Sequence, residues 1–330
     1  MKKSLLYTIA IGILAMAACK KLPDGNLSDI IRYEVLPIEI KRGRVDVSTA
    51  INPAGSSKPT EYKLLKIYEK ETGKVVTDIF EKPYPIKIWT ALHDPKVDKS
   101  IEQINAKMKD TVMGALRINK LSGAIEYNKH TLNIPKGVYT FDLEIKNSNG
   151  TRTYPKIGEF KIIDAPFYEI PAVRSTTAMK VGAETTTKSI PNNENHIKVT
   201  ALDTIGNRIT VRFLDKNGAP FNPKAGEIER RPNSGTAGGF LQTMQDYAMT
   251  TTLFDDRIEF TYGVVPFPLY TLGNGFNYYY RIPAKYVKYD DSLELPYNTY
   301  SCNPRFSFRT YYKGNYTIDV IIPQVTRVKP

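Results

Sequence analysis

Alternating apolar and polar residues recur along the chain and predict short β-strands. The clearest case is 138–146, where every second residue from Tyr139 to Ile145 is apolar, so one face is buried and the other is wet. The sequence Asn-Ser-Asn-Gly at 147–150 then predicts a turn, and 160–163 supplies a closing strand. This pattern fits the last hairpin of a β-sandwich.

Two further patterns precede this hairpin. The apolar runs 62–68 and 75–80 flank a glycine turn at 71–74 and predict another hairpin. Ser100 and Gln103 have the spacing of a capping box, and the apolar residues that follow recur on one face. We therefore expect one short helix that packs across the end or side of a sheet.

Three segments in the second half alternate in the same way, at Ile209 to Phe213, Ile258 to Tyr262 and Tyr316 to Ile322. Because they are far apart in the sequence, they must pair non-locally, as in a sandwich or jelly roll. No alternation of strands with long helices is visible, which argues against a parallel α/β sheet.

We predict a mostly β protein with two β-sandwich domains. Prolines and polar residues interrupt the strand pattern at 164–177, which is typical of a boundary. The expected domains are 29–164 and a larger, aromatic-rich sandwich or jelly roll at 165–330. The length of 330 residues fits two domains, and 22 Tyr, 22 Pro and 21 Gly favour strands and turns over helices.

The first 18 residues have the pattern of an export signal. A positive start that includes Lys2 and Lys3 precedes an apolar run at 5–14, too short to be a permanent membrane anchor, and then small residues. Residues 19–28 have no periodicity and predict a tether. An ordinary signal peptide that has a cysteine near its cleavage point is one interpretation of these features.

The stretch Leu-Ala-Met-Ala-Ala-Cys at 14–19 is more specific, because it resembles the lipobox of bacterial lipoproteins. In that family the cysteine thiol receives a diacylglycerol, the chain is cut before the cysteine, and the new amino end is acylated. The resemblance implies that Cys19 is lipidated and that membrane lipid is a partner of the mature chain. With Cys19 acylated, we expect Cys302 to be a buried, unpaired apolar side chain.

The charge of the chain excludes some partners. Loss of Lys2 and Lys3 with the signal lowers the net charge from +12 to +10, and the remaining basic residues are scattered without a helical period. This disfavours nucleic-acid binding. After the signal, no apolar run reaches about 18 residues, so we expect no membrane-spanning helix in the mature chain.

Motifs for catalysis and metal binding are missing from the sequence. It contains no Walker loop, His-Glu-x-x-His, EF-hand or Gly-x-Ser-x-Gly pattern, and His93, His130 and His196 are isolated from one another. We therefore expect no metal and no cofactor, assign no catalytic residue, and keep glycoside hydrolase as a minority hypothesis. The carboxylates considered for it are Asp255 with Asp256, Glu227 with Glu229, and Asp290 and Asp291 with Glu294.

Aromatic residues give a stronger lead. An exposed ring can stack on the apolar face of a sugar while a tyrosine hydroxyl forms hydrogen bonds. Aromatic residues are also preferred in strands, so most of them are expected to fill the core, and only exposed ones can bind. The glycan-binding candidates are Trp89, Tyr270, Phe276, Tyr278, Tyr279 and Tyr280.

The order of residues at 123–125, Thr131, 137–143, Asn147 and Gly150 resembles the final strands of immunoglobulin-like modules in Bacteroidota outer-membrane lipoproteins. Those modules commonly accompany polysaccharide-utilisation systems of the starch-utilisation type. The resemblance implies an immunoglobulin-like sandwich for the first domain and similarity to accessory, surface glycan-binding proteins.

Three Asp-Ser/Thr-apolar triplets resemble the sites at which Bacteroidota glycosylate exported proteins on a hydroxyl, and they give Thr111, Thr204 and Ser292 as candidates. Cys19 is followed by Lys20 and Lys21 instead of an acidic run, which leaves the orientation at the outer membrane, toward the cell surface or the periplasm, open.

These inferences together predict a lipid-anchored, non-catalytic protein of the outer membrane that binds an oligosaccharide or polysaccharide in a glycan-uptake system. The alternative is a structural or assembly partner of an outer-membrane transporter. Glycoside hydrolysis remains the third hypothesis.

Overall fold

The computed structural model describes residues 26–170, 175–192, 196–232, 241–271 and 275–329. The chain divides into two compact units. The N-terminal unit comprises the residues up to 86 and 110–165, and the C-terminal unit comprises 87–109 and 166–330. The chain passes between the units within β4 (Tyr84–Trp89), again within β5 (Met108–Met113), and finally after residue 165.

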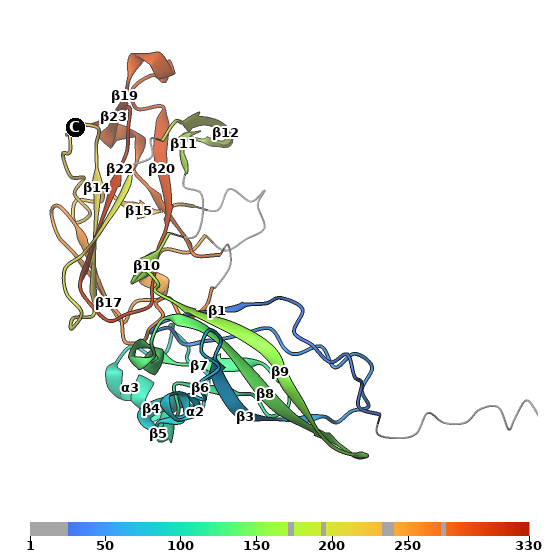
Figure 1. Ribbon diagram of the computed structural model, residues 1–330. Helices are drawn as coiled ribbons and strands as arrows, with labels where there is room; N and C mark the ends of the chain where they lie inside the picture. Colours follow the sequence, from blue (N-terminus) through green and yellow to red (C-terminus); the bar gives the residue numbers. More distant parts are fainter. Residues whose placement is uncertain (1–25, 171–174, 193–195, 233–240, 272–274, 330) are drawn as a thin grey trace, which may run out of the picture. The chain divides into compact units, whose positions relative to one another are not determined.

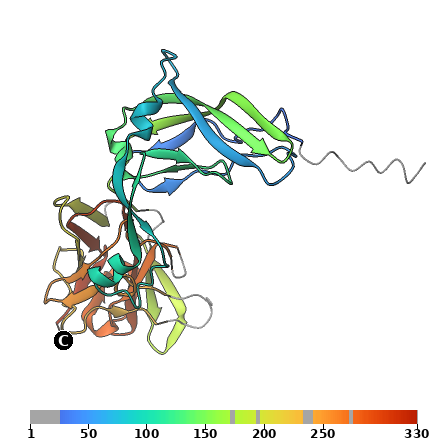
Figure 2. The ribbon, with the colours of Figure 1, turned by 90° about the horizontal axis from the view of Figure 1, so that it is seen from below.

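The N-terminal unit is a β-sandwich whose layers can be followed in Figures 1 and 2. Its apolar core takes side chains from both sheets, including Phe141 of the larger sheet and Ile125 of the smaller one. The larger sheet has the order β1 (Ile38–Lys41), β9 (Gly150–Ile163), β8 (Gly137–Asn147) and β3 (Glu61–Glu69). The smaller sheet has the order β2 (Asp46–Val47), β7 (Ile125–Tyr127) and β6 (Leu116–Ile118).

The hairpin predicted at 138–163 is confirmed. Asn147 pairs with Gly150 across a two-residue turn, and the Asn147 side chain accepts a hydrogen bond from the backbone N–H of Asn149 at 3.0 Å. Phe141 and Leu143 have no exposed surface, so the alternating pattern identified the buried face correctly.

The hairpin predicted at 62–80 forms only in part. The turn exists, and Tyr68 pairs with Val75, but residues Thr77–Glu81 form the short helix α2, and β3 pairs with β8 instead. The hydroxyl of Thr77 accepts the hydrogen bond of the Ile67 N–H at 2.9 Å, where a continuing strand would use a backbone carbonyl. The helix turns Phe80 fully into the core.

The part of the predicted tether that the structure describes is bonded to the N-terminal unit. The Asn26 carbonyl accepts a hydrogen bond from the Ser57 N–H at 2.9 Å, and the Ser28 carbonyl accepts one from the Tyr154 hydroxyl at 2.8 Å. The signal peptide at 1–18 and Cys19 lie outside the described residues.

The C-terminal unit is a larger sandwich of two five-stranded sheets. Phe213 joins the two layers, because its ring centroid lies 5.0 Å from that of Tyr280 and 6.2 Å from that of Phe306. The β20 sheet has the order β12 (Ala183–Ile190), β11 (Ser175–Lys180), β20 (Tyr300–Ser307), β18 (Asn277–Arg281) and β15 (Glu229–Arg230). The β14 sheet has the order β13 (Ile197–Ala201), β22 (Tyr316–Ile321), β14 (Arg208–Leu214), β17 (Ile258–Thr261) and β16 (Thr250–Leu253).

The three alternating segments of the second half are neighbours in the β14 sheet. β22 runs parallel to β14, and β17 runs antiparallel to it, so the predicted non-local pairing is confirmed. Short pairs complete the strands, namely β4 with β5, β10 (Tyr168–Glu169) with β21 (Arg309–Thr310), and β19 (Val287–Tyr289) with β23 (Val325–Arg327). Single helical turns of 3-10 type occur at η1 (Lys129–Asn133), η2 (Met244–Asp246), η3 (Ala284–Tyr286) and η4 (Asp291–Leu293).

The predicted helix forms as α3 (Ile101–Ala106), and its capping box is present. The Ser100 hydroxyl accepts a hydrogen bond from the Gln103 N–H, and the Gln103 side chain accepts one from the Ser100 N–H. This helix belongs to the C-terminal unit. A Cβ on Gly263 would lie 2.3 Å from Ile104 Cδ1, so the absence of a side chain at Gly263 permits the close approach of α3.

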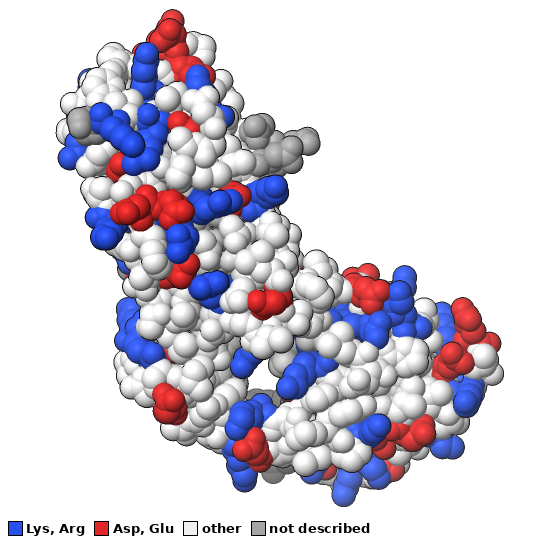
Figure 3. Space-filling view, turned by 90° about the vertical axis from the view of Figure 1, so that its left-hand side faces the viewer, with Lys and Arg blue, Asp and Glu red and all other residues white. Residues whose placement is uncertain are grey.

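The surface and the helices limit other interactions. Basic and acidic side chains are interspersed over the face shown in Figure 3, without a broad basic stripe. In the described ranges, no helix combines the length and the apolar character needed to cross a membrane.

Candidate functional site

Three of the six candidate aromatic residues are buried, which corrects the expectation that this segment shows rings to solvent. Tyr278 and Tyr280 have no exposed surface, and Tyr279 is 6% exposed. β18 lies between β20 and β15, with Tyr278 and Tyr280 in the core. Tyr279 faces the other side of the sheet, where the Arg305 guanidinium lies 6.0 Å from its ring centroid. These three rings cannot stack on a ligand in this structure.

Phe276 is half-buried and already has a cation on its ring. The guanidinium carbon of Arg309 lies 4.5 Å from the Phe276 ring centroid and 5.2 Å from that of Tyr311. Arg309 is fixed there because its guanidinium donates to the carbonyls of Pro268 and Leu269 at 3.3 and 3.2 Å. Phe276 is therefore engaged in an internal cation–π contact.

Trp89 and Tyr270 meet at His93 in the C-terminal unit, although 177 residues separate His93 from Tyr270. The ring centroids of Trp89 and His93 are 5.6 Å apart, and the Tyr270 hydroxyl donates to the His93 carbonyl at 2.9 Å. Tyr270 is 39% exposed, and Trp89 is half-buried. We call Trp89, His93 and Tyr270 the His93 site.

A buried polar network holds His93 in place. Its Nδ1 lies 3.0 Å from the Asp98 carboxylate, and the same oxygen accepts hydrogen bonds from the Asp94 N–H at 2.7 Å and from Lys107 Nζ at 2.8 Å. Lys107 also donates to the Leu92 carbonyl at 2.9 Å. Since the side chains of His93 and Asp98 are only 6% and 2% exposed, the network fixes the segment that carries Trp89.

Burial and hydrogen bonding determine the protonation states of His93 and Asp98. Burial lowers the pKa of His93 more than the hydrogen bond and charge of Asp98 raise it, so the imidazole is neutral at neutral pH. Burial alone would raise the pKa of Asp98, but the hydrogen bonds from Lys107, the Asp94 backbone and His93 outweigh it and lower that pKa. A carboxylate thus faces one cation, and His93 Nδ1 carries the proton that it donates to Asp98.

The His93 site is a surface platform. The hollow between His93 and Tyr270 has a volume of about 10 Å³, at the lower end of the ~10–15 Å³ that a cavity needs to hold one water molecule. In the sequence beside Trp89 and His93, Ile88 is 39% exposed and Leu92 is 91% exposed. A ligand would therefore lie across the exposed ring surface of Trp89 and Tyr270, without a deep pocket.

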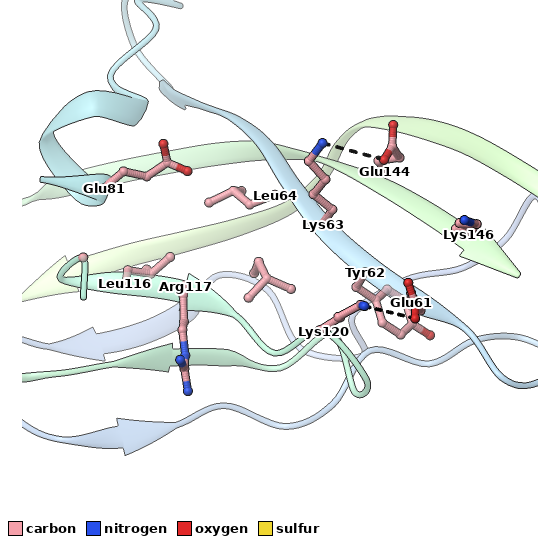
Figure 4. Close-up of a pocket in the computed structure, with 12 residues that line it drawn as sticks. Glu61, Tyr62, Lys63, Leu64, Glu81, Leu116, Arg117, Lys120, Glu144 and Lys146 are labelled. Atoms are coloured by element: carbon pink, nitrogen blue, oxygen red, sulfur yellow. Dashed lines mark ion pairs between the residues drawn. The ribbon is translucent and has the colours of Figure 1, made fainter. Parts of the chain in front are cut away.

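A second hollow, of about 690 Å³, opens in the N-terminal unit between β3 and β6. Figure 4 shows Lys63 reaching toward Glu144, with an N–O distance of 4.0 Å, and Lys120 toward Glu61, at 3.1 Å. Tyr62, the aromatic residue of its lining, is only 4% exposed. The volume suits a small ligand, but these wall charges neutralise each other in pairs, and the lining offers no exposed ring.

The carboxylates considered for hydrolysis are held in ion pairs or are exposed at the surface. Glu227 forms a bidentate pair with Arg327, with both N–O distances 2.6 Å, and is 3% exposed. Asp256 pairs with Arg257 at 2.8 Å, and Asp290 pairs with Lys216. Glu229, Asp291 and Glu294 are exposed at the surface. Glu227 therefore has a structural role.

In the described part of the chain, the other two histidines and Cys302 make no contact that assigns them to the His93 site. His130 stacks on Tyr84 in the N-terminal unit with ring centroids 4.4 Å apart, and His196 is 7% exposed. Cys302 is fully buried, as predicted, and burial raises the pKa of its thiol. Within the described ranges, no three His, Cys, Asp or Glu side chains gather as a metal site would require.

The candidate glycosylation residues differ in their accessibility. Thr204 and Ser292 are exposed, whereas Thr111 is half-buried in β5. The Asp203 carboxylate accepts hydrogen bonds from the backbone N–H groups of Ile205 and Gly206 and so shapes the turn that carries Thr204. Modification of these hydroxyls stays a prediction, with Thr204 and Ser292 favoured by exposure.

The importance of His93 was missed at the level of sequence. No other histidine, cysteine or catalytic motif lies near it, and its partners Asp98 and Lys107 have no diagnostic spacing. The one local signal is the run Asp94-Pro95 followed by the Ser100 cap, which predicts a tight turn before a helix and so brings Asp98 back toward His93.

Comparisons with known proteins give little. No family model and no curated protein matches the chain. Among solved structures, the chain is similar to a SusE-like surface-located polysaccharide-binding protein from the heparin-utilisation locus of Bacteroides thetaiotaomicron, with a TM-score of 0.24 and 10% identity. The match spans 87% of this chain and 52% of the other, little more than half of that protein. A TM-score of this size does not establish a common fold.

Proposed function

We propose that this protein is a non-catalytic carbohydrate-binding protein of the cell envelope that captures an oligosaccharide or polysaccharide on the His93 site. The observation that carries the proposal is the convergence of Trp89 and Tyr270 on His93 at the surface of the C-terminal unit. Two rings at one place offer apolar faces to a sugar, which neither ring supplies alone.

The rigidity of the site supports binding. Asp98 is buried beside His93 and already paired with Lys107, so a ligand does not have to order this segment. Preorganisation of this kind reduces the entropy that binding would otherwise cost. The Tyr270 hydroxyl is also committed to the His93 carbonyl, which fixes the orientation of the ring.

The compartment is part of the proposal and rests on the sequence. The export signal at 1–18 and the lipobox-like stretch ending at Cys19 support attachment of the mature chain to the outer membrane by lipid. A glycan-binding protein in that position would hold polymer near an uptake system.

The test uses the intrinsic fluorescence of the protein. Trp89 is the sole tryptophan of the chain, so a change in tryptophan emission on adding a glycan reports directly on the His93 site. We expect at least one member of a panel of plant, host and microbial glycans to shift the emission and to release heat in calorimetry. Tyr270→Ala should weaken that binding about tenfold, the loss of one stacked ring.

A matched control is available in the same unit. Tyr297 is 52% exposed and its hydroxyl also donates to a backbone carbonyl, that of Lys285 at 2.9 Å, so Tyr297→Ala removes a similar ring elsewhere. Equal losses in the Tyr270 and Tyr297 variants would contradict a specific site. Silence across the whole glycan panel would remove the proposal.

A second function is favoured by one observation. Leu92 and Val97, at 91% and 61% exposed, add apolar surface on the segment between Trp89 and α3, as a protein contact would. If the protein is an assembly partner of an outer-membrane transporter, the transporter should co-purify with it. Leu92→Ser should then abolish co-purification and leave glycan affinity unchanged.

A further inference from the structure

An arginine cluster lies on the outer face of the β20 sheet and is remote in sequence from Trp89. Arg281 lies on β18, Arg305 on β20, and Arg231 directly after β15. Arg305 is paired with Tyr279 in the strand register, and the Arg231 N–H bonds to the Tyr279 carbonyl at 3.4 Å. Because directly paired residues share a face, Arg231 and Arg305 flank Tyr279 on the side opposite the core.

The cluster is partly built and held by neighbours. Arg281 donates to Glu184 at 2.6 Å and to the Asn303 side-chain oxygen at 3.3 Å. Asn303 is fully buried, and its amide nitrogen donates to the Thr177 carbonyl at 3.1 Å, which fixes the orientation of the amide. The Arg281 side chain is 12% exposed, so its guanidinium is held in place and largely removed from water.

Arg231 lies within the electrostatic reach of Arg281 and Arg305. Glu184 pairs with Arg281, and the exposed Glu229 is the register partner of Arg281 and forms no ion pair with it in the described residues. The Nε of Arg231 is buried and has no hydrogen-bond partner among the described residues. Burial lowers the pKa of Arg231, and the charges of Arg281 and Arg305 lower it further.

We propose that Arg231, Arg281 and Arg305 form a binding site for an oxyanion, a carboxylate or sulfate group, such as an acidic sugar carries. The planar guanidinium group matches the two oxygens of such a group with paired N–H donors. A bound oxyanion would offset the repulsion within the cluster and give the Arg231 Nε an acceptor. The site is separate from the His93 site and does not depend on glycan stacking there.

Calorimetry at low salt tests the proposal with three probes, inorganic sulfate, tetragalacturonic acid and the neutral maltotetraose. We expect the two anions to bind and Arg231→Gln to weaken them about tenfold or more, as loss of a charge-assisted hydrogen bond predicts. Tighter binding of tetragalacturonic acid than of sulfate would assign the site to an acidic sugar, and equal binding would assign it to a free anion. Both results support an oxyanion site.

Two further variants distinguish loss of the site from misfolding and from a general loss of positive charge. Glu184→Gln removes the competing carboxylate and should strengthen anion binding, a gain that misfolding cannot produce. Arg208→Gln is the matched control, because Arg208 is 47% exposed on the β14 sheet and lies 3.7 Å from Glu259. No anion binding by the wild type, or equal losses in the Arg231 and Arg208 variants, would overturn the proposal.

The outcome is independent of the proposed function. Tyr270→Ala should leave sulfate binding unchanged, and Arg231→Gln should leave the binding of any neutral glycan unchanged. A protein that binds neutral glycans but no anion would retain the His93 site and lose only the arginine site.

Discussion

Asp98 is the residue on which the His93 site depends most, and Asp98→Asn tests this dependence. One carboxylate oxygen accepts hydrogen bonds from His93, from the Asp94 backbone and from Lys107, at 3.0, 2.7 and 2.8 Å. The substitution keeps the shape of the side chain but removes the charge, and an amide NH₂ at that position would face three donors.

The magnitude follows from burial and charge. Breaking a buried ion pair by removing one partner costs about 3–5 kcal/mol, but the Lys107 side chain is 27% exposed and recovers part of its hydration. We therefore expect a loss of about 2–3 kcal/mol in the free energy of unfolding of the C-terminal unit, in the range of one hydrogen bond to a charged group. Urea unfolding followed by Trp89 emission measures it, since this tryptophan lies in the network's own segment.

The control is an exposed ion pair of the same type. Asp164 and Lys136 are 64% and 60% exposed and lie 2.8 Å apart. Asp164→Asn should change stability by less than about 1 kcal/mol. If Asp98→Asn proved as mild as the control, or left the Trp89 emission maximum of the folded protein unchanged, the network would not be what positions the ring.

Four further outcomes are expected. Because the pKa of His93 is lowered on folding from its ordinary 6.5, the unfolded chain takes up that proton first, and stability falls as the pH drops below about 6.5. The urea midpoint of His93→Gln should therefore change less between pH 7.5 and 5.5 than that of the wild type. Parallel pH profiles of the two proteins would count against a neutral buried imidazole. Gly263→Val should lower the unfolding midpoint by displacing α3, as hydrogen exchange of the helix amides would reveal. Gly137→Ala is the comparison for glycine removal, because an added Cβ there would make only ordinary contacts, the nearest at 3.5 Å from Tyr139. In a Cys19→Ser variant, the Cys302 thiol should react with a thiol reagent only after urea unfolding, and prompt labelling of the folded protein would refute its burial. Mass spectrometry of the native protein should find residue 19 as an acylated amino end; an intact Met1 with an unmodified Cys19 would remove the lipoprotein prediction.

The sequence predicted those parts of the fold that depend on local pattern. Alternation in β8 and the spacing of Ser100 and Gln103 require only neighbours along the chain, and both predictions are confirmed. The segment 75–80 was predicted as a strand from its β-favouring residues, and this was wrong. Most of it forms the helix α2, which buries Phe80 in the core.

The candidate site depended on contacts that pattern alone does not encode. Alternation places Tyr278 and Tyr279 on opposite faces of β18, but it does not say whether either ring is exposed, and both rings are buried. Trp89 and Tyr270 were each recognisable as aromatic candidates. Their meeting at His93 arises from folding of distant segments, for which a single sequence carries no local signal.

The path of the chain has a consequence for how this protein can be divided. Trp89, His93 and α3 precede residue 110 in the sequence, yet they belong with the residues that follow 165. A gene fragment beginning at residue 166 would encode both five-stranded sheets. It would lack the segment that packs on Gly263 and carries Trp89 and His93 of the His93 site. The two units therefore cannot be inherited, exchanged or expressed as simple head and tail halves, and any transplant of the platform must carry residues 87–109 with it.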